Sequence, residues 1–191
     1  LQTIENKINL IDVVSVFRGV SVNEFSSDGK NIPFIRIGDL GNGLINSNTG
    51  KTVKVEKGVL KKIERALAKK GDILLSCRGT NGKTAIIESN HDGSLISSQI
   101  MILRTTDKIL PEYLMATLNS QLVQRQISGL LRGTAQQYFT VNELEKIIIS
   151  LPSLEKQHKI VSEFIKLNQE IAKLESTLNE KRAKFESLIK K

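Results

Sequence analysis

Hydrophobic and polar positions divide the chain into two parts that meet near Leu151 and Pro152. In the first part, short apolar runs alternate with Gly, Asn, Asp and Ser, which is typical of strands joined by tight loops. In the second part, apolar positions recur at helical spacing, and no Gly or Pro follows Pro152. We therefore expect a globular domain over residues 1–151 and one long helix over residues 152–191.

The globular part predicts a mixed α and β fold (α+β) that is rich in strands. We expect strands over residues 32–37, 52–55, 72–76, 84–88 and 98–104, where aliphatic and β-branched residues gather. The Gly- and Asn-rich residues 38–50 predict a loop. Pro111, at a first helical turn, predicts a helix over residues 112–128, and residues 59–70 are a second, shorter helical candidate.

The C-terminal helix, for which Ser153 is a suitable N-cap, carries a continuous apolar seam. Two columns of positions seven residues apart begin at Gln157 and Ile160, and eight of their ten members are apolar, which is the spacing of a coiled coil. Packing against its own globular part is the alternative, but a helix of about 55–60 Å exceeds a domain of roughly 30–35 Å. We therefore expect a partner helix on the seam formed by Ile160, Phe164, Leu167, Ile171, Leu174, Leu178, Phe185 and Leu188.

Charge favours a polyanionic partner. The chain has 28 Lys and Arg against 20 Asp and Glu, a net charge of +8. The C-terminal helix holds nine basic and six acidic residues, so most of the excess lies on the globular part. A solvated basic surface without a partner is the alternative interpretation of this charge.

Composition offers little for metal or disulfide chemistry. Cys77 is the single cysteine, His91 and His158 stand in unrelated contexts, and we expect neither a metal nor a cofactor. No apolar run approaches the roughly 20 residues of a membrane span, and the first residues do not resemble a signal peptide, so we expect a cytoplasmic protein. Because the chain begins at Leu1, we expect a trimmed protein or a piece of a longer one.

The segment from Cys77 to Thr84 ends in Gly-Lys-Thr, as a phosphate-binding loop does, but Cys77 replaces the first glycine of that motif. We interpret it instead as a tight turn between two strands. It either presents Arg78, Thr80, Asn81 and Lys83 to DNA or is a plain basic hairpin. A pairing of Cys77 with His91 as nucleophile and base is not favoured, and methyl-donor and nuclease motifs are absent from the sequence, so we expect no enzyme activity on this chain.

A second polar loop lies between Gly129 and Phe139. Arg can donate two hydrogen bonds to guanine, Gln can pair with adenine, and Thr can bond a base or a phosphate. The loop therefore predicts DNA contacts, with an ordinary connector anchored by Tyr138 and Phe139 as the alternative. The residues that carry the prediction are Arg132, Thr134, Gln136 and Gln137.

Four motifs in order resemble one known family: Pro33-x-Ile35-Arg36-x-Gly38-Asp39-Leu40, the run over residues 70–76, the loop over residues 132–137, and the apolar strand and Pro-x-x-Glu-x-Gln sequence over residues 147–157. From about Ile32 to its end, the chain resembles a target recognition domain of a type I restriction–modification DNA specificity subunit. Arg36, which lies in the first of these motifs, is a further candidate DNA-binding residue. It implies a non-catalytic subunit that positions a separate adenine-N6 methyltransferase and, in full complexes, a restriction subunit.

Specificity subunits of this family typically carry two recognition domains and two antiparallel helices, whereas this chain has one of each. It is therefore expected to be a half-subunit that dimerises, one half of a longer subunit, or a domain from a fused methyltransferase. A different class also fits the residues, namely a basic coiled-coil adaptor that binds protein or RNA without reading DNA sequence. Uniform affinity for any polyanion would distinguish that adaptor from a sequence-specific DNA-binding protein.

Overall fold

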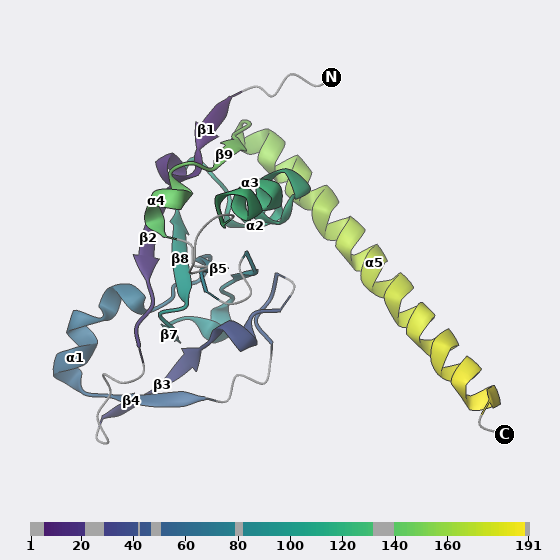
Figure 1. Cartoon of the computed structure of the whole chain (residues 1–191), viewed down its shortest axis with the longest axis horizontal. Helices are drawn as coiled ribbons and strands as arrows, with labels where there is room; N and C mark the ends of the chain where they lie inside the picture. Colours follow the sequence, from purple (N-terminus) through teal and green to yellow (C-terminus); the bar gives the residue numbers. More distant parts are fainter. Residues whose placement is uncertain are drawn as a thin grey trace.

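A four-stranded antiparallel sheet in the order β2-β8-β5-β6 lies at the centre of the fold (Figure 1). The computed structural model describes residues 6–21, 29–41, 43–46, 51–78, 82–131 and 140–189. The sheet is formed by β2 (Val14–Arg18), β8 (Ile100–Thr105), β5 (Ile73–Ser76) and β6 (Thr84–Ile86). This mixed arrangement of strands and helices confirms the predicted α+β class.

The central sheet separates two apolar clusters because successive strand side chains point to opposite faces. Ile73, Leu75 and Met101 face the helices and pack with Leu114 and other buried residues. Leu74, Ile100 and Ile102 point the other way and pack against Ile35, Ile87 and Ile96. Apolar side chains therefore cover both faces of this sheet, and the core is almost entirely aliphatic.

A second, three-stranded sheet in the order β4-β3-β7 covers the face opposite the helices. Its strands are β4 (Thr52–Val55), β3 (Lys30–Ile35) and β7 (Leu95–Ile96), with β3 antiparallel to β4 and parallel to β7. Helix α1 (Lys57–Lys62) and the 3₁₀ turn η4 (Glu64–Ala66) follow β4 and pack on the cluster around Phe34. The helix suggested over residues 59–70 is thus a single short helix and a 3₁₀ turn.

Two helices lie on the other face of the central sheet, α2 (Pro111–Asn119) and α3 (Gln121–Leu131). The sequence predicted one helix over residues 112–128, and this prediction was wrong at Ser120, whose ψ of 146° is extended. Side chains at the break form hydrogen bonds that a continuous helix would not make. Ser120 Oγ accepts from Val123 N, and the Asn119 amide bonds the Thr84 hydroxyl of β6. Asn and Ser compete with the helical backbone in this way, which favours a helix end.

Residues from both ends of the globular part meet in a small unit. Strand β1 (Lys7–Asn9) pairs with β9 (Ile148–Ser150), and the 3₁₀ turn η1 (Leu10–Val13) follows β1. Helix α4 (Val141–Leu144) begins with a capping box formed by Thr140 and Glu143. In this box, the side chain of each residue accepts a hydrogen bond from the backbone N–H of the other. The hydrogen bonds from Thr140 lower the pKa of the Glu143 carboxyl.

The remaining short elements are 3₁₀ turns, η3 (Ile37–Asp39) and η5 (Ser89–His91). The predicted strand over residues 52–55 is confirmed as β4. Those expected over residues 32–37, 72–76, 84–88 and 98–104 exist with shifted ends as β3, β5, β6 and β8. No strand was predicted at β1, β2 or β7, which carry short or mixed patterns.

Helix α5 (Leu154–Ile189) leaves the globular part and projects away from it (Figure 1). Its only buried side chains are those of Gln157 and Val161, in the first two turns. Gln157 falls in one of the coiled-coil columns without belonging to the predicted seam, and the structure gives it another role. Its amide is fully buried, accepts from Leu110 N at 2.8 Å and donates to Lys108 O and Pro152 O at 3.0 and 2.9 Å. A primary amide suits this position because it offers both donors and an acceptor.

Candidate nucleic-acid interface

The turn between β5 and β6 presents basic side chains at one end of the central sheet. Ser76 N donates to Lys83 O, and Lys83 N donates to Ser76 Oγ, both at 2.9 Å. These bonds bring Arg78 and Lys83 onto the same short turn, and both residues are exposed. Thr80 and Asn81 lie outside the described residues.

Helix α3 packs against this turn through Gln124. The amide of Gln124 donates to Gly82 O at 3.2 Å and to Leu118 O at 2.8 Å. Gly82 has a φ of +79°, and a Cβ there would meet Gln124 Oε1 at 2.9 Å, so this position requires glycine. The turn is thereby fixed against the start of α3 rather than standing alone.

The outer face of α3 was missed by the sequence analysis. A shallow groove of about 550 Å³ on this face is lined by Gln121, Gln124, Arg125, Ser128 and Gly129. The spacing of three and four residues between them marks one helix face, and Val123 and Ile127 are buried on the opposite one. The polar periodicity of residues 121–129 could have indicated this face in the sequence. The face brings amide and guanidinium groups next to the turn that holds Arg78 and Lys83.

The second predicted loop cannot be placed on this surface. Arg132, Thr134, Gln136 and Gln137 all lie outside the described residues, between the end of α3 and Thr140. Their assignment as DNA-binding residues stays a prediction. The structure describes the helices that flank this loop: α3 precedes it, and the capped helix α4 follows it.

Arg36 follows β3 and begins the turn η3. Its backbone N–H donates to Asp39 Oδ2 at 2.8 Å, and its Nε lies 3.6 Å from the same oxygen. The side chain is 42% exposed. The Asp39 carboxylate therefore caps the turn by accepting from the Arg36 backbone, and the exposed part of the Arg36 side chain remains available for a ligand.

Cys77 and His91 are not hydrogen-bonded to each other, since the thiol bonds Ser98 O and His91 Nδ1 has no hydrogen-bond partner among the described residues. Burial raises the pKa of the Cys77 thiol, against the opposing influence of Arg18 and Arg78, so the thiol is held in its neutral form. Cys77 Sγ lies 3.9 Å from Ser98 O, and the side chain packs in the helix-facing cluster. In the part of the chain that the structure describes, no group of three His, Cys, Asp or Glu residues could hold a metal ion.

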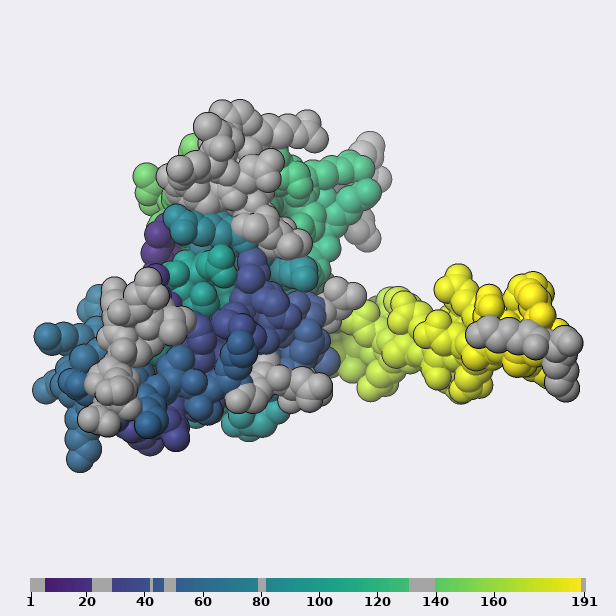
Figure 2. All heavy atoms as spheres, turned by 60° about the horizontal axis from the view of Figure 1, so that its bottom comes forward, coloured from purple at the N-terminus to yellow at the C-terminus, as the bar shows by residue number. Residues whose placement is uncertain are grey.

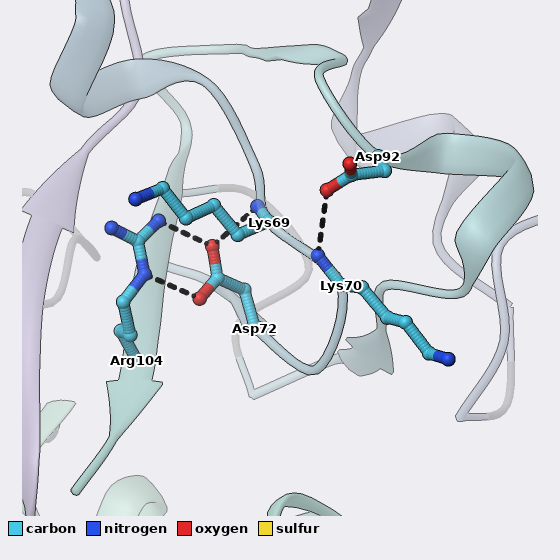
Figure 3. A network of polar contacts seen from close by, with 5 residues as sticks. All are labelled: Lys69, Lys70, Asp72, Asp92 and Arg104. Carbon is cyan, nitrogen blue, oxygen red and sulfur yellow. Dashed lines mark hydrogen bonds and ion pairs between the residues drawn. The ribbon is translucent and has the colours of Figure 1, made fainter.

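The most deeply buried charge belongs to a pair with a structural role (Figure 3). Asp72 accepts two hydrogen bonds from Arg104, at 2.8 and 2.7 Å, and one from Lys69 N at 2.7 Å. Arg104 also lies 4.9 Å from the centre of the Phe17 ring. The bonds to Asp72 raise the pKa of the Arg104 guanidinium, and the pair fixes the turn before β5.

A comparison with models of protein families identifies the family of this chain. The model of the type I restriction modification DNA specificity domain matches residues 6–181. The chain belongs to this family. The membership confirms the resemblance that the four sequence motifs carry and covers both the globular part and most of α5.

Two curated specificity subunits are similar to this specificity domain in sequence. The EcoBI specificity subunit of the type I restriction enzyme from Escherichia coli is 24% identical over 157 residues, which are 82% of this chain and 33% of that protein. A protein of Haemophilus influenzae, named as a candidate type I specificity subunit, is 30% identical over 81% of this chain and 38% of its own length. The chain spans little more than a third of these relatives.

Solved structures share the fold of the specificity domain. A chain from a study of complex assembly and conformational transition of the type I restriction–modification system matches 96% of this chain and 43% of its own length, with a TM-score of 0.71 and 21% identity. The HsdS subunit from Thermoanaerobacter tengcongensis matches 90% of this chain and 39% of its own length, with a TM-score of 0.61 and 20% identity. Both matches cover nine tenths or more of this chain.

None of the helices in the described ranges is long and apolar enough to cross a membrane.

Proposed function

We propose that this chain reads one part of a DNA target as a component of a type I restriction–modification specificity subunit. The observation that carries the proposal is membership of the DNA specificity domain family over residues 6–181. The exposed Arg78 and Lys83 and the polar face of α3 lie together on a domain with an excess of positive charge and provide groups that bind bases and phosphates. The adaptor alternative has no comparable observation in its favour.

Selection from a random duplex library tests the proposal. The purified chain, alone and with an adenine-N6 methyltransferase subunit, should enrich one sequence, and its affinity for that sequence should exceed its affinity for a scrambled duplex by about 10³-fold or more. Equal affinity for every duplex and for RNA would contradict DNA sequence recognition and support the adaptor.

Substitutions in the two loops should separate base contacts from phosphate contacts. Arg132→Ala or Gln136→Ala should weaken binding of the selected sequence by about 1–3 kcal/mol per lost base contact. Lys83→Ala should weaken binding of selected and scrambled duplexes alike, since lysine more often meets phosphate. Titrations at several salt concentrations measure both effects, and three variants with wild-type affinity and salt dependence would place the binding surface elsewhere.

The specificity domain family is non-catalytic, and we propose that methylation and cleavage reside on partner subunits. With DNA, S-adenosylmethionine, ATP and magnesium, the pure chain is expected to give no product. Adenine methylation should appear only when the methyltransferase subunit is added. Turnover that is proportional to the pure chain and survives repurification would contradict this division of labour.

We also propose that residues 152–191 are a spacer and docking helix for the recognition part over residues 1–151. Apart from the half-buried Phe164, every apolar seam residue is between 44% and 65% exposed: Ile160, Leu167, Ile171, Leu174, Leu178, Phe185 and Leu188. The seam therefore does not pack on its own domain. A second long helix, from an identical chain or from another recognition half, would cover it.

Leu174→Asp should abolish association through α5, because it places a charge in the middle of the seam. The solution mass at tens of micromolar protein measures the effect, with Glu175→Gln on the neighbouring exposed position as the control. A wild-type dimer that becomes monomeric supports pairing of identical chains. A wild-type monomer would exclude homodimerisation and indicate that the partner helix belongs to another segment.

A further inference from the structure

The positive charge of the chain is concentrated in twenty residues. Between Lys51 and Lys70 there are eight basic residues and two acidic ones, Glu56 and Glu64, a net charge of +6 out of +8 for the whole chain. The other 171 residues together carry only +2. We call these eight side chains the basic surface: Lys51, Lys54, Lys57, Lys61, Lys62, Arg65, Lys69 and Lys70.

Apolar packing turns the basic side chains outward. In β4, Val53 and Val55 face the cluster around Phe34, so the alternating position Lys54 faces solvent. In α1 and the residue after it, Val59, Leu60 and Ile63 pack on the same cluster, so Lys57, Lys61 and Lys62 occupy the outer side. All eight basic residues are exposed.

Two acidic side chains near the basic surface accept hydrogen bonds from backbone N–H groups. Asp92 accepts a hydrogen bond from Lys70 N, and Asp72 binds Lys69 N together with Arg104 (Figure 3). The carboxylates therefore hold the turn in place instead of neutralising the ammonium groups. Within the described ranges, none of the eight side chains forms an ion pair with an acid. The net charge of +6 on residues 51–70 is therefore not cancelled by ion pairs among the described residues.

The part of the basic surface on β4 and α1 lies at the side of the globular part that is farthest from the free end of α5. Figures 1 and 2 show β4 and α1, in blue, at one extreme of the molecule and the C-terminal half of α5, in yellow, at the other. A partner helix on the seam would therefore leave this surface open. Figure 2 shows the blue segment on the same face as part of the green helical region that includes α3.

We propose that the basic surface binds the phosphate backbone of duplex DNA and supplies most of the salt-dependent affinity of this specificity domain. Seven of its eight cations are lysines, which are point charges on flexible stems and suit phosphates without a fixed geometry. Duplex DNA presents a continuous row of negative charge that can neutralise a surface of this extent. The proposal rests on the proposed DNA-binding function and adds the surface that carries the charge-dependent part of it.

The test is the triple variant Lys57→Gln, Lys61→Gln and Lys62→Gln. Gln has a helix propensity close to that of Lys, so α1 should be retained, which equal thermal unfolding would verify. The control is Lys166→Gln, Lys173→Gln and Lys184→Gln, which removes three exposed charges from α5 instead. Each full-length protein is titrated with the selected duplex and with a scrambled duplex between about 50 and 200 mM salt.

The α1 variant should lose about 2–3 units from the slope of log affinity against log salt, since each lost phosphate contact removes roughly 0.9. The loss should be equal for both duplexes, so the specificity ratio stays the same, and the control should keep the wild-type slope. A wild-type slope in the α1 variant would overturn the inference while leaving the proposed function intact. If that variant instead loses affinity for the methyltransferase subunit, the surface docks protein.

Two further outcomes separate the inference from the proposed function. If the wild type enriches no sequence but binds any duplex with a slope that the α1 variant loses, sequence recognition fails and the phosphate-binding surface stands. If the α1 variant loses binding to the selected duplex alone, the surface reads bases and its assignment to phosphate is wrong.

Discussion

Asp72→Ala should destabilise the folded chain by about 3 kcal/mol, because it leaves the Arg104 guanidinium without its carboxylate and Lys69 N without an acceptor. Asp72 is 1% exposed, whereas the Arg104 side chain is 27% exposed, so water would recover part of the loss on the arginine side. Denaturation in urea measures the change in the free energy of unfolding.

Two further variants show which interaction causes the loss of stability in Asp72→Ala. Asp92→Ala removes a carboxylate that also accepts from a neighbouring backbone N–H, at 2.8 Å, but from an exposed position, and should cost about 1 kcal/mol. The double variant Asp72→Ala with Arg104→Met should be more stable than the sum of its single variants, since it removes the uncompensated charge. Additive single effects, or equal losses at Asp72 and Asp92, would show that the buried pair contributes no coupling.

Two of the predicted strands, β5 and β8, have side chains that pack on two apolar clusters. β5 and β8 are continuous aliphatic runs because both faces of the central sheet are covered, and such runs stand out in a sequence. β1 and β9 are three-residue strands, and β7 has two residues, so their pairing depends on partners remote in the chain. Local pattern therefore identified β5 and β8 at the centre of the fold and did not identify β1, β2 and β7.

The candidate site was only partly accessible to sequence reasoning. The polar loops stood out because polar and basic residues gather beside glycines there. The face of α3 required knowing that the helix breaks at Ser120, which sets the register of Gln121, Arg125 and Ser128. The basic surface could have been found by counting charge in short windows rather than over a whole domain, but its exposure follows from the packing of Val59, Leu60 and Ile63 beneath it.

Gln157 shows how one residue can satisfy a heptad position in the sequence and a different role in the structure. It stands seven residues before Phe164 and so falls in one of the two columns of the repeat, although the apolar seam begins at Ile160. Its amide instead joins the turn that carries Lys108 and Leu110, just before α2, to Pro152 at the start of α5. Periodicity cannot tell these roles apart, because the first turns of α5 and its exposed part share one repeat. The seam free for a partner therefore begins after this anchor.

Gln157→Leu should destabilise the chain by about 3–5 kcal/mol, since it leaves one buried N–H and two carbonyl groups without their partner. Gln169→Leu makes the same change on an exposed part of α5 and should shift the free energy of unfolding by less than about 0.5 kcal/mol. Because the amide fixes α5 to the globular part, distances between spin labels on α1 and on the far half of α5 should also broaden in Gln157→Leu and stay narrow in Gln169→Leu. Broadening should persist under conditions where the variant is fully folded, which separates a loss of orientation from a loss of stability. Equal stability and equally narrow distances in both variants would show that the direction of α5 is set by the apolar contacts around Val161 instead.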